Sequence, residues 1–68
     1  MKFYKDEWEE LIANCGFTDD ELEIVHLLMR GWYEEDIAAE LGYSRRTIGR
    51  RKRIIKAKIS RYIVKAQH

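Results

Sequence analysis

The sequence has no proline, four glycines and one cysteine among its 68 residues. With so few helix breakers, little interrupts long helices. The lone Cys15 cannot form an internal disulfide, and together with two scattered histidines it makes no recognisable set of metal ligands. We therefore expect no metal and no other cofactor. The chain also lacks a long apolar run, so we expect neither an N-terminal secretion signal nor a membrane span, and the protein reads as intracellular.

The short chain limits what the protein can do. A domain of this size buries only about 60% of the surface that its unfolded chain exposes. We expect one domain over residues 1–68, without room for a large enzymatic cleft. Catalytic combinations such as His/Asp/Ser or Cys/His do not occur at useful spacing, and no glycine-rich phosphate loop is present. We predict that the protein is not an enzyme.

The charges are divided unevenly along the chain. Residues 1–43 hold three basic residues and all twelve acidic ones, a net charge of −9, whereas residues 44–68 hold ten basic residues and no acid. A basic segment of this kind favours a polyanion as partner. A solvated helix that merely opposes the acidic half is the plain alternative. Nine of the acids would stand in the first turns of helices, where each stabilises the helix dipole by roughly 0.3–1 kcal/mol.

Apolar residues recur at helical spacing along the chain, and capping residues mark where helices begin. The first predicted helix covers 6–15, with Asp6 and Glu9 at capping-box spacing. The second follows Thr18, a good N-cap whose box Glu21 completes. No strand pattern competes with these helices.

Two more helices follow. The third is short, covering 34–41, and has Tyr33 at its cap; the fourth runs from Ser44, a strong cap, to about Lys65. One side of the fourth is an apolar stripe and the opposite side is rich in arginine. The stripe comprises Ile48, Ile55, Ile59, Tyr62, Ile63 and Ala66. The fold class that we predict is all-α, a small bundle of about four helices with a long C-terminal helix.

The third and fourth predicted helices have the order of a helix-turn-helix motif over residues 34–58. Ala38 is small and lets the two helices approach closely, and Gly42 tolerates the positive φ of the turn. The side chain of Ile48 then packs the second helix of the motif against the first. Basic residues follow the Ser44 cap directly. This combination predicts a DNA-binding motif whose last helix is the recognition helix.

Two stretches carry a family resemblance. Residues 17–28, reading FTDDELEIVHLL, resemble the opening of LuxR-type DNA-binding domains, and residues 31–59, reading GWYEEDIAAELGYSRRTIGRRKRIIKAKI, resemble their helix-turn-helix and equally that of sigma-factor region 4. The part that reads LGYSRRTI is also similar to small phage-encoded regulators with sigma-region-4-like domains. The resemblance implies a small helical bundle that binds DNA through its penultimate or last helix. The extra helix before Phe17, and the lack of a break after Ile59, favour the sigma-region-4 and phage-regulator side.

The predicted function is sequence-specific binding of double-stranded DNA by a small bacterial or phage transcriptional regulator, with the helix from Ser44 onward in the major groove. Arginine can donate two hydrogen bonds to guanine O6 and N7. The residues that we expect to contact bases are Arg46, Arg50 and Arg53. Side chains beside that arc suit the DNA backbone, namely Arg45, Thr47, Arg51 and Lys56. The expected location is the cytoplasm, at the bacterial nucleoid.

One small module binds DNA with modest affinity, so we expect a homodimer or a larger homo-oligomer. Candidate contact surfaces are the C-terminal end of the apolar stripe, the exposed parts of the first helix, including Phe3, Tyr4 and Trp8, and Ile54. Two alternatives stay open. The first alternative to a regulator is the DNA-binding module of a phage packaging (small terminase) or recombination assembly. The second is an interaction module that docks on RNA polymerase through its acidic half.

Overall fold

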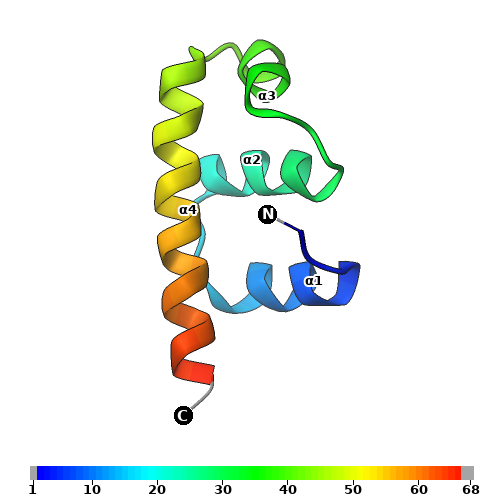
Figure 1. Cartoon of the computed structure of the whole chain (residues 1–68), viewed down its shortest axis with the longest axis vertical. Helices are drawn as coiled ribbons and strands as arrows, with labels where there is room; N and C mark the ends of the chain where they lie inside the picture. The colour runs from blue at the N-terminus through cyan, green and yellow to red at the C-terminus, as the bar shows by residue number, and fades with distance from the viewer. Residues whose placement is uncertain (1, 67–68) are drawn as a thin grey trace.

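The computed structural model describes residues 2–66 and forms an all-α bundle, as predicted. Four helices follow one another, and no strand occurs in this range: α1 (Lys5–Asn14), α2 (Asp19–Met29), α3 (Glu34–Leu41) and α4 (Arg45–Ala66). Figure 1 shows α4 as one long rod, with the three shorter helices stacked along one side of it. Of these, α3 lies beside the N-terminal half of α4 and α1 beside its C-terminal half.

The caps of the last three helices are those that the sequence predicts. The Thr18 Oγ1 atom accepts a hydrogen bond from the Glu21 N–H at 3.2 Å, and the Glu21 carboxylate accepts from the Thr18 N–H at 2.9 Å. At the start of α4, Ser44 Oγ accepts from the Thr47 N–H at 3.1 Å. Tyr33 precedes α3 without a side-chain cap, and the first turn of α3 holds three acids. These bonds satisfy N–H groups that have no partner within a helix.

The predicted cap of the first helix is wrong. α1 begins at Lys5, its N-cap is Tyr4, and Asp6 lies inside the first turn. The Tyr4 N–H donates a 2.8 Å hydrogen bond to the Glu7 carboxylate, three residues on. The box therefore closes two residues earlier than the Asp6–Glu9 spacing suggested, because the carboxylate of Glu7 can reach back to the N–H of Tyr4.

The turn between α3 and α4 depends on Gly42. Its φ of 75° lies in the left-handed region, where a residue with a Cβ is strained. Beyond it, the Tyr43 N–H donates to the Ala38 carbonyl at 3.0 Å, which closes the end of α3. α4 can therefore start immediately and pack against α3.

The core joins all four helices. α4 contributes Ile48, Ile55 and Ile59 to it, each buried. The rest comes from the shorter helices and comprises Trp8, Leu11, Ile24, Val25, Leu28, Ile37 and Ala38. At about 1.5–3 kcal/mol for each fully buried side chain, this core holds α4 in one orientation.

The apolar stripe of α4 is shorter than predicted. Tyr62 is half-buried and donates a 2.8 Å hydrogen bond to the Glu10 carboxylate, which raises the pKa of the phenol. Ile63 and Ala66 are exposed. Both residues line an open groove between α1 and the end of α4, and Figure 1 shows no further helix beside that end of α4.

Lys58 of α4 forms an ion pair with the first turn of α2 and a hydrogen bond with the segment before it. The Lys58 ammonium donates to the Glu21 carboxylate at 2.6 Å and to the Gly16 carbonyl at 3.2 Å. Burial by itself would raise the pKa of Glu21, but the hydrogen bonds from Lys58 and Thr18 outweigh it and hold that pKa below its usual value. Cys15 lies close by and packs against the core; burial raises the pKa of its thiol, against a smaller opposing effect of Lys58.

Candidate nucleic-acid interface

Three arginines share the outer face of α4. Arg46, Arg50 and Arg53 are exposed, and their spacing of four and three residues places them opposite Ile48 and Ile55. Within residues 2–66 none of the three forms an ion pair. The structure thus brings together, and leaves accessible, the side chains for which we predict base contacts.

The same three arginines line a surface hollow between α4 and the start of α3. Its other lining residues are Gly49 and Glu34. Gly49 lies inside the helix, where it costs on the order of 1 kcal/mol relative to alanine. Apart from the adjacent residues and backbone of its own helix, a Cβ at Gly49 would meet no atom within 4 Å, so internal packing does not require a glycine there.

The side chains with predicted backbone contacts divide into two groups. Arg45 and Lys56 are exposed beside the arginine face. Thr47 is half-buried, and its Oγ1 accepts a 2.9 Å hydrogen bond from Ser44 Oγ, which leaves its own proton free for an acceptor outside. All three remain suited to phosphate.

Arg51, also predicted to contact a phosphate, has partners within the protein. Its guanidinium stacks over the Tyr43 ring, 4.4 Å from the ring centroid, and Nη1 lies 3.9 Å from an Asp20 carboxylate oxygen. That Nη1 is buried and has no hydrogen-bond partner. Arg51 follows Ile48 by three residues and so turns toward the bundle. It thus links α2 to the turn before α4.

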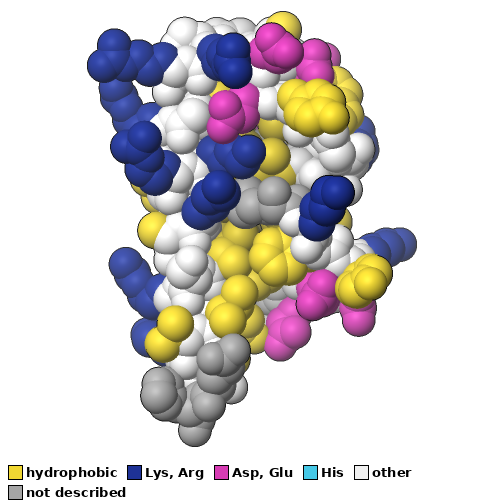
Figure 2. All heavy atoms as spheres, viewed as in Figure 1, with side chains coloured by type: hydrophobic (Ala, Val, Ile, Leu, Met, Phe, Trp, Pro, Cys, Tyr) yellow, Lys and Arg dark blue, Asp and Glu magenta, His cyan; other side chains and the backbone are white. Residues whose placement is uncertain are grey.

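Most basic side chains of α4 form no ion pair with a described residue. Three of its ten basic residues lie within 4 Å of a carboxylate: Arg51, Lys58, and Lys52, whose Nζ is 3.6 Å from Glu34. The other seven form no ion pair with a described residue, and they comprise Arg45, Arg46, Arg50, Arg53, Lys56, Arg61 and Lys65. Figure 2 shows Lys and Arg side chains gathered over α4, with acids over α1 and α3. The surface of α4 is therefore complementary to a polyanion.

The contacts of two acidic residues in this region could not be predicted from the sequence. Glu34 stands at the start of α3, where its negative charge counts against a phosphate contact, yet it lines the arginine hollow. Glu21 is recognisable as a capping residue, but its ion pair with Lys58 joins positions 37 residues apart. Neither sequence spacing nor composition gives a signal for such contacts between elements.

In comparisons with protein-family models, with curated proteins and with solved structures, nothing matches this chain. Over residues 2–66, none of the helices is both long enough and apolar enough to cross a membrane. The same part of the chain contains no group of three or more His, Cys, Asp or Glu side chains that could hold a metal ion.

Proposed function

We propose that the protein binds double-stranded DNA sequence-specifically and acts as a small transcriptional regulator of bacterial or phage type. The observation that carries the proposal is the set of three exposed, unpaired arginines on the outer face of a rigid α4. Such a regulator would work in the bacterial cytoplasm, at the nucleoid.

The order of the last two helices supports this role. α3, the Gly42 turn and α4 follow one another as in a helix-turn-helix, over residues 34–58. In such motifs the N-terminal part of the second helix enters the major groove, which is about 12 Å wide and admits a helix. Arg46 and Arg50 would then read guanines, Arg53 would follow next along the groove, and Arg45, Thr47 and Lys56 would hold the backbone.

The test is selection of bound sequences from a random duplex pool, with wild type, Arg50→Ala and Arg61→Ala. Arg61 is a matched control, because it is an exposed arginine of α4 outside the hollow. We expect wild type and Arg61→Ala to enrich the same half-site, and Arg50→Ala to lose preference at one base position, a discrimination of about 1–3 kcal/mol. A wild-type pool without enrichment would refute sequence-specific regulation.

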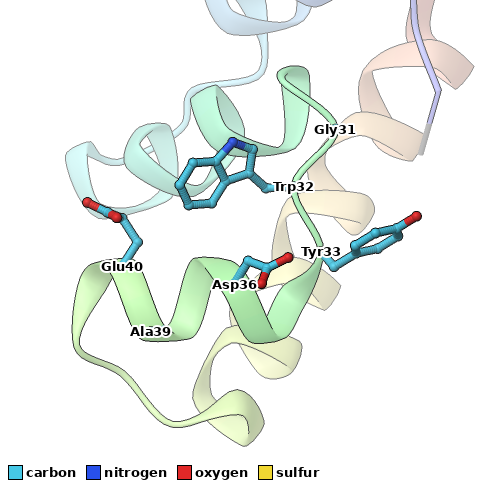
Figure 3. A pocket seen from close by; sticks show the side chains of 6 residues that line it. All are labelled: Gly31, Trp32, Tyr33, Asp36, Ala39 and Glu40. Carbon is cyan, nitrogen blue, oxygen red and sulfur yellow. The ribbon is translucent and has the colours of Figure 1, made fainter.

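A second role, docking on another protein such as RNA polymerase, is favoured by a separate hollow. It lies between the turn after α2 and the outer side of α3, and Figure 3 shows Asp36 and Glu40 beside the indole of Trp32, while Tyr33 points away. An indole flanked by two carboxylates suits a cationic side chain of a partner. Asp36→Asn with Glu40→Gln would then abolish partner binding, whereas Arg46→Glu with Arg50→Glu would abolish DNA binding alone.

We also propose that the protein works as a homodimer. A largely apolar groove between α1 and the end of α4 contains Phe3, Tyr62 and Ile63. Light scattering of the pure protein distinguishes the roles, since a dimer suits a regulator on a palindromic site and a ring suits a packaging or recombination assembly.

A further inference from the structure

The hollow on the proposed DNA-binding face contains one acid among its basic residues. Glu34 is the first residue of α3, and it lines the hollow together with Arg46, Arg50 and Arg53. About a third of its side chain, 32%, is exposed. A carboxylate at this place opposes the attraction that the three arginines exert on phosphate.

Glu34 forms no ion pair with the three arginines of the hollow. Within residues 2–66 its only ionic partner is Lys52, whose Nζ lies 3.6 Å from Oε1. At that distance, and with both side chains partly exposed, the pair is weak and Lys52 neutralises the carboxylate incompletely. The remaining negative field acts on any group that enters the hollow.

Phosphates and base edges respond differently to that field. A phosphate in the hollow would be repelled by Glu34 through its full negative charge, whereas the edge of a neutral base carries only partial charges and would be repelled less. In a complex with a non-matching duplex, the arginines would contact phosphates. In a matched complex they extend to guanine O6 and N7, and the phosphates lie along the flanks of α4.

Glu34 is also dispensable as a capping charge. Glu35 and Asp36 share its helix turn and serve the α3 dipole in the same way, and both are exposed. Neither of them lines the arginine hollow. Glu34 therefore differs from these two neighbours in that it lines the arginine hollow, is partly buried and lies near Lys52.

We propose that Glu34 is a specificity-determining residue of the DNA-binding face, which weakens binding through phosphates and so favours duplexes that offer the matching bases. The inference rests on the proposed function. Specificity of this kind comes from a repulsive element against the wrong ligand and needs no further attraction for the right one.

The experiment compares Glu34→Gln with Glu35→Gln, which removes a neighbouring charge of the same helix turn outside the hollow. Dissociation constants are measured for the selected duplex and for a scrambled duplex of equal length, at several salt concentrations. For Glu34→Gln we expect affinity for the scrambled duplex to rise about threefold to tenfold, and affinity for the selected duplex to rise less. The salt slope on scrambled DNA should steepen by about one.

Circular dichroism spectra and melting curves of both variants show whether they fold as wild type does. Equal effects of the two substitutions, or an equal rise for both duplexes, would overturn the inference and leave DNA binding untouched. A wild-type protein that enriches no sequence would overturn the proposed function and, with it, this inference. A fall in selectivity confined to Glu34→Gln supports it.

Discussion

At the residue scale, Glu21 does two things at once. Its carboxylate closes the capping box of α2 and accepts the hydrogen bond of Lys58 from α4, while only 8% of the residue is exposed. The three arginines of the candidate site, by contrast, have a position that the sequence predicts. The sequence predicts the exposure of Arg46, Arg50 and Arg53, because each lies on the side of α4 opposite Ile48, Ile55 and Ile59. Arg51 could not be placed in this way, since its stacking on Tyr43 depends on where the turn before α4 passes.

The ion pair of Glu21 predicts a pH-dependent stability. We expect Glu21→Gln to lower the free energy of unfolding at pH 7 by about 1–2 kcal/mol, because Lys58 loses its counter-charge while partly exposed. The pKa of Glu21 is lower in the folded protein than in the unfolded chain. Its stabilising effect is therefore full above the unfolded value of about 4.3 and is lost as the pH falls through the folded value.

Urea unfolding of wild type and Glu21→Gln at pH 7 and near pH 3 measures this effect, and the difference between the two proteins should shrink at the lower pH. Glu23→Gln is the control, since Glu23 is an exposed acid of the same helix and forms no ion pair with a described residue. If the difference in free energy of unfolding between wild type and Glu21→Gln stays constant with pH, the effect of Glu21 comes from packing and its charge is not the cause.

At the scale of the element, the helices follow from local chemistry. α3 occupies the predicted residues, and α4 begins directly after the Ser44 cap. The failure in α1 has a local cause too, since two acids compete to close the box and Glu7 reaches the free N–H of Tyr4. The exposure of Ile63 could not be predicted from a helical wheel, because a wheel does not show where the neighbouring helices end.

A substitution at Gly49 tests both the stability of α4 and its approach to DNA. Gly49→Ala should raise the free energy of unfolding by about 0.5–1 kcal/mol, because a Cβ meets open space there and alanine favours the helix. If DNA approaches α4 closely at Gly49, the same substitution should weaken binding of the selected duplex. Thermal melting and a DNA titration of one protein sample measure both effects.

Ala57→Gly is the matched control, because Ala57 is exposed on the outer side of α4, one turn beyond the hollow. It should cost about 1 kcal/mol of stability and leave the affinity for DNA unchanged. Tighter or equal binding by Gly49→Ala would mean that the glycine serves no close approach.

At the scale of the whole molecule, charge is separated between the two halves of the chain. Seven basic side chains of α4 remain without an ionic partner among the described residues, while acids dominate the shorter helices. If about six phosphates are neutralised, the logarithm of the affinity should fall with the logarithm of salt concentration at a slope near −5. Titrations of one duplex at a series of salt concentrations measure the slope.

Lys56→Ala sharpens this measurement. Lys56 is exposed beside the arginine face, so its loss should weaken binding to all duplexes alike and reduce the slope by about one. An unchanged slope would place Lys56 away from the backbone. A change of sequence preference would instead make Lys56 a base contact.

The sequence alone determined the four helices, most of their caps and the outward direction of Arg46, Arg50 and Arg53, because periodicity and capping act within a few residues. Only the tertiary structure decided which acids lie against side chains of α4, namely Glu10, Asp20, Glu21 and Glu34. Such contacts depend on how the turns orient one helix against another, and residue spacing within a helix carries no record of that orientation.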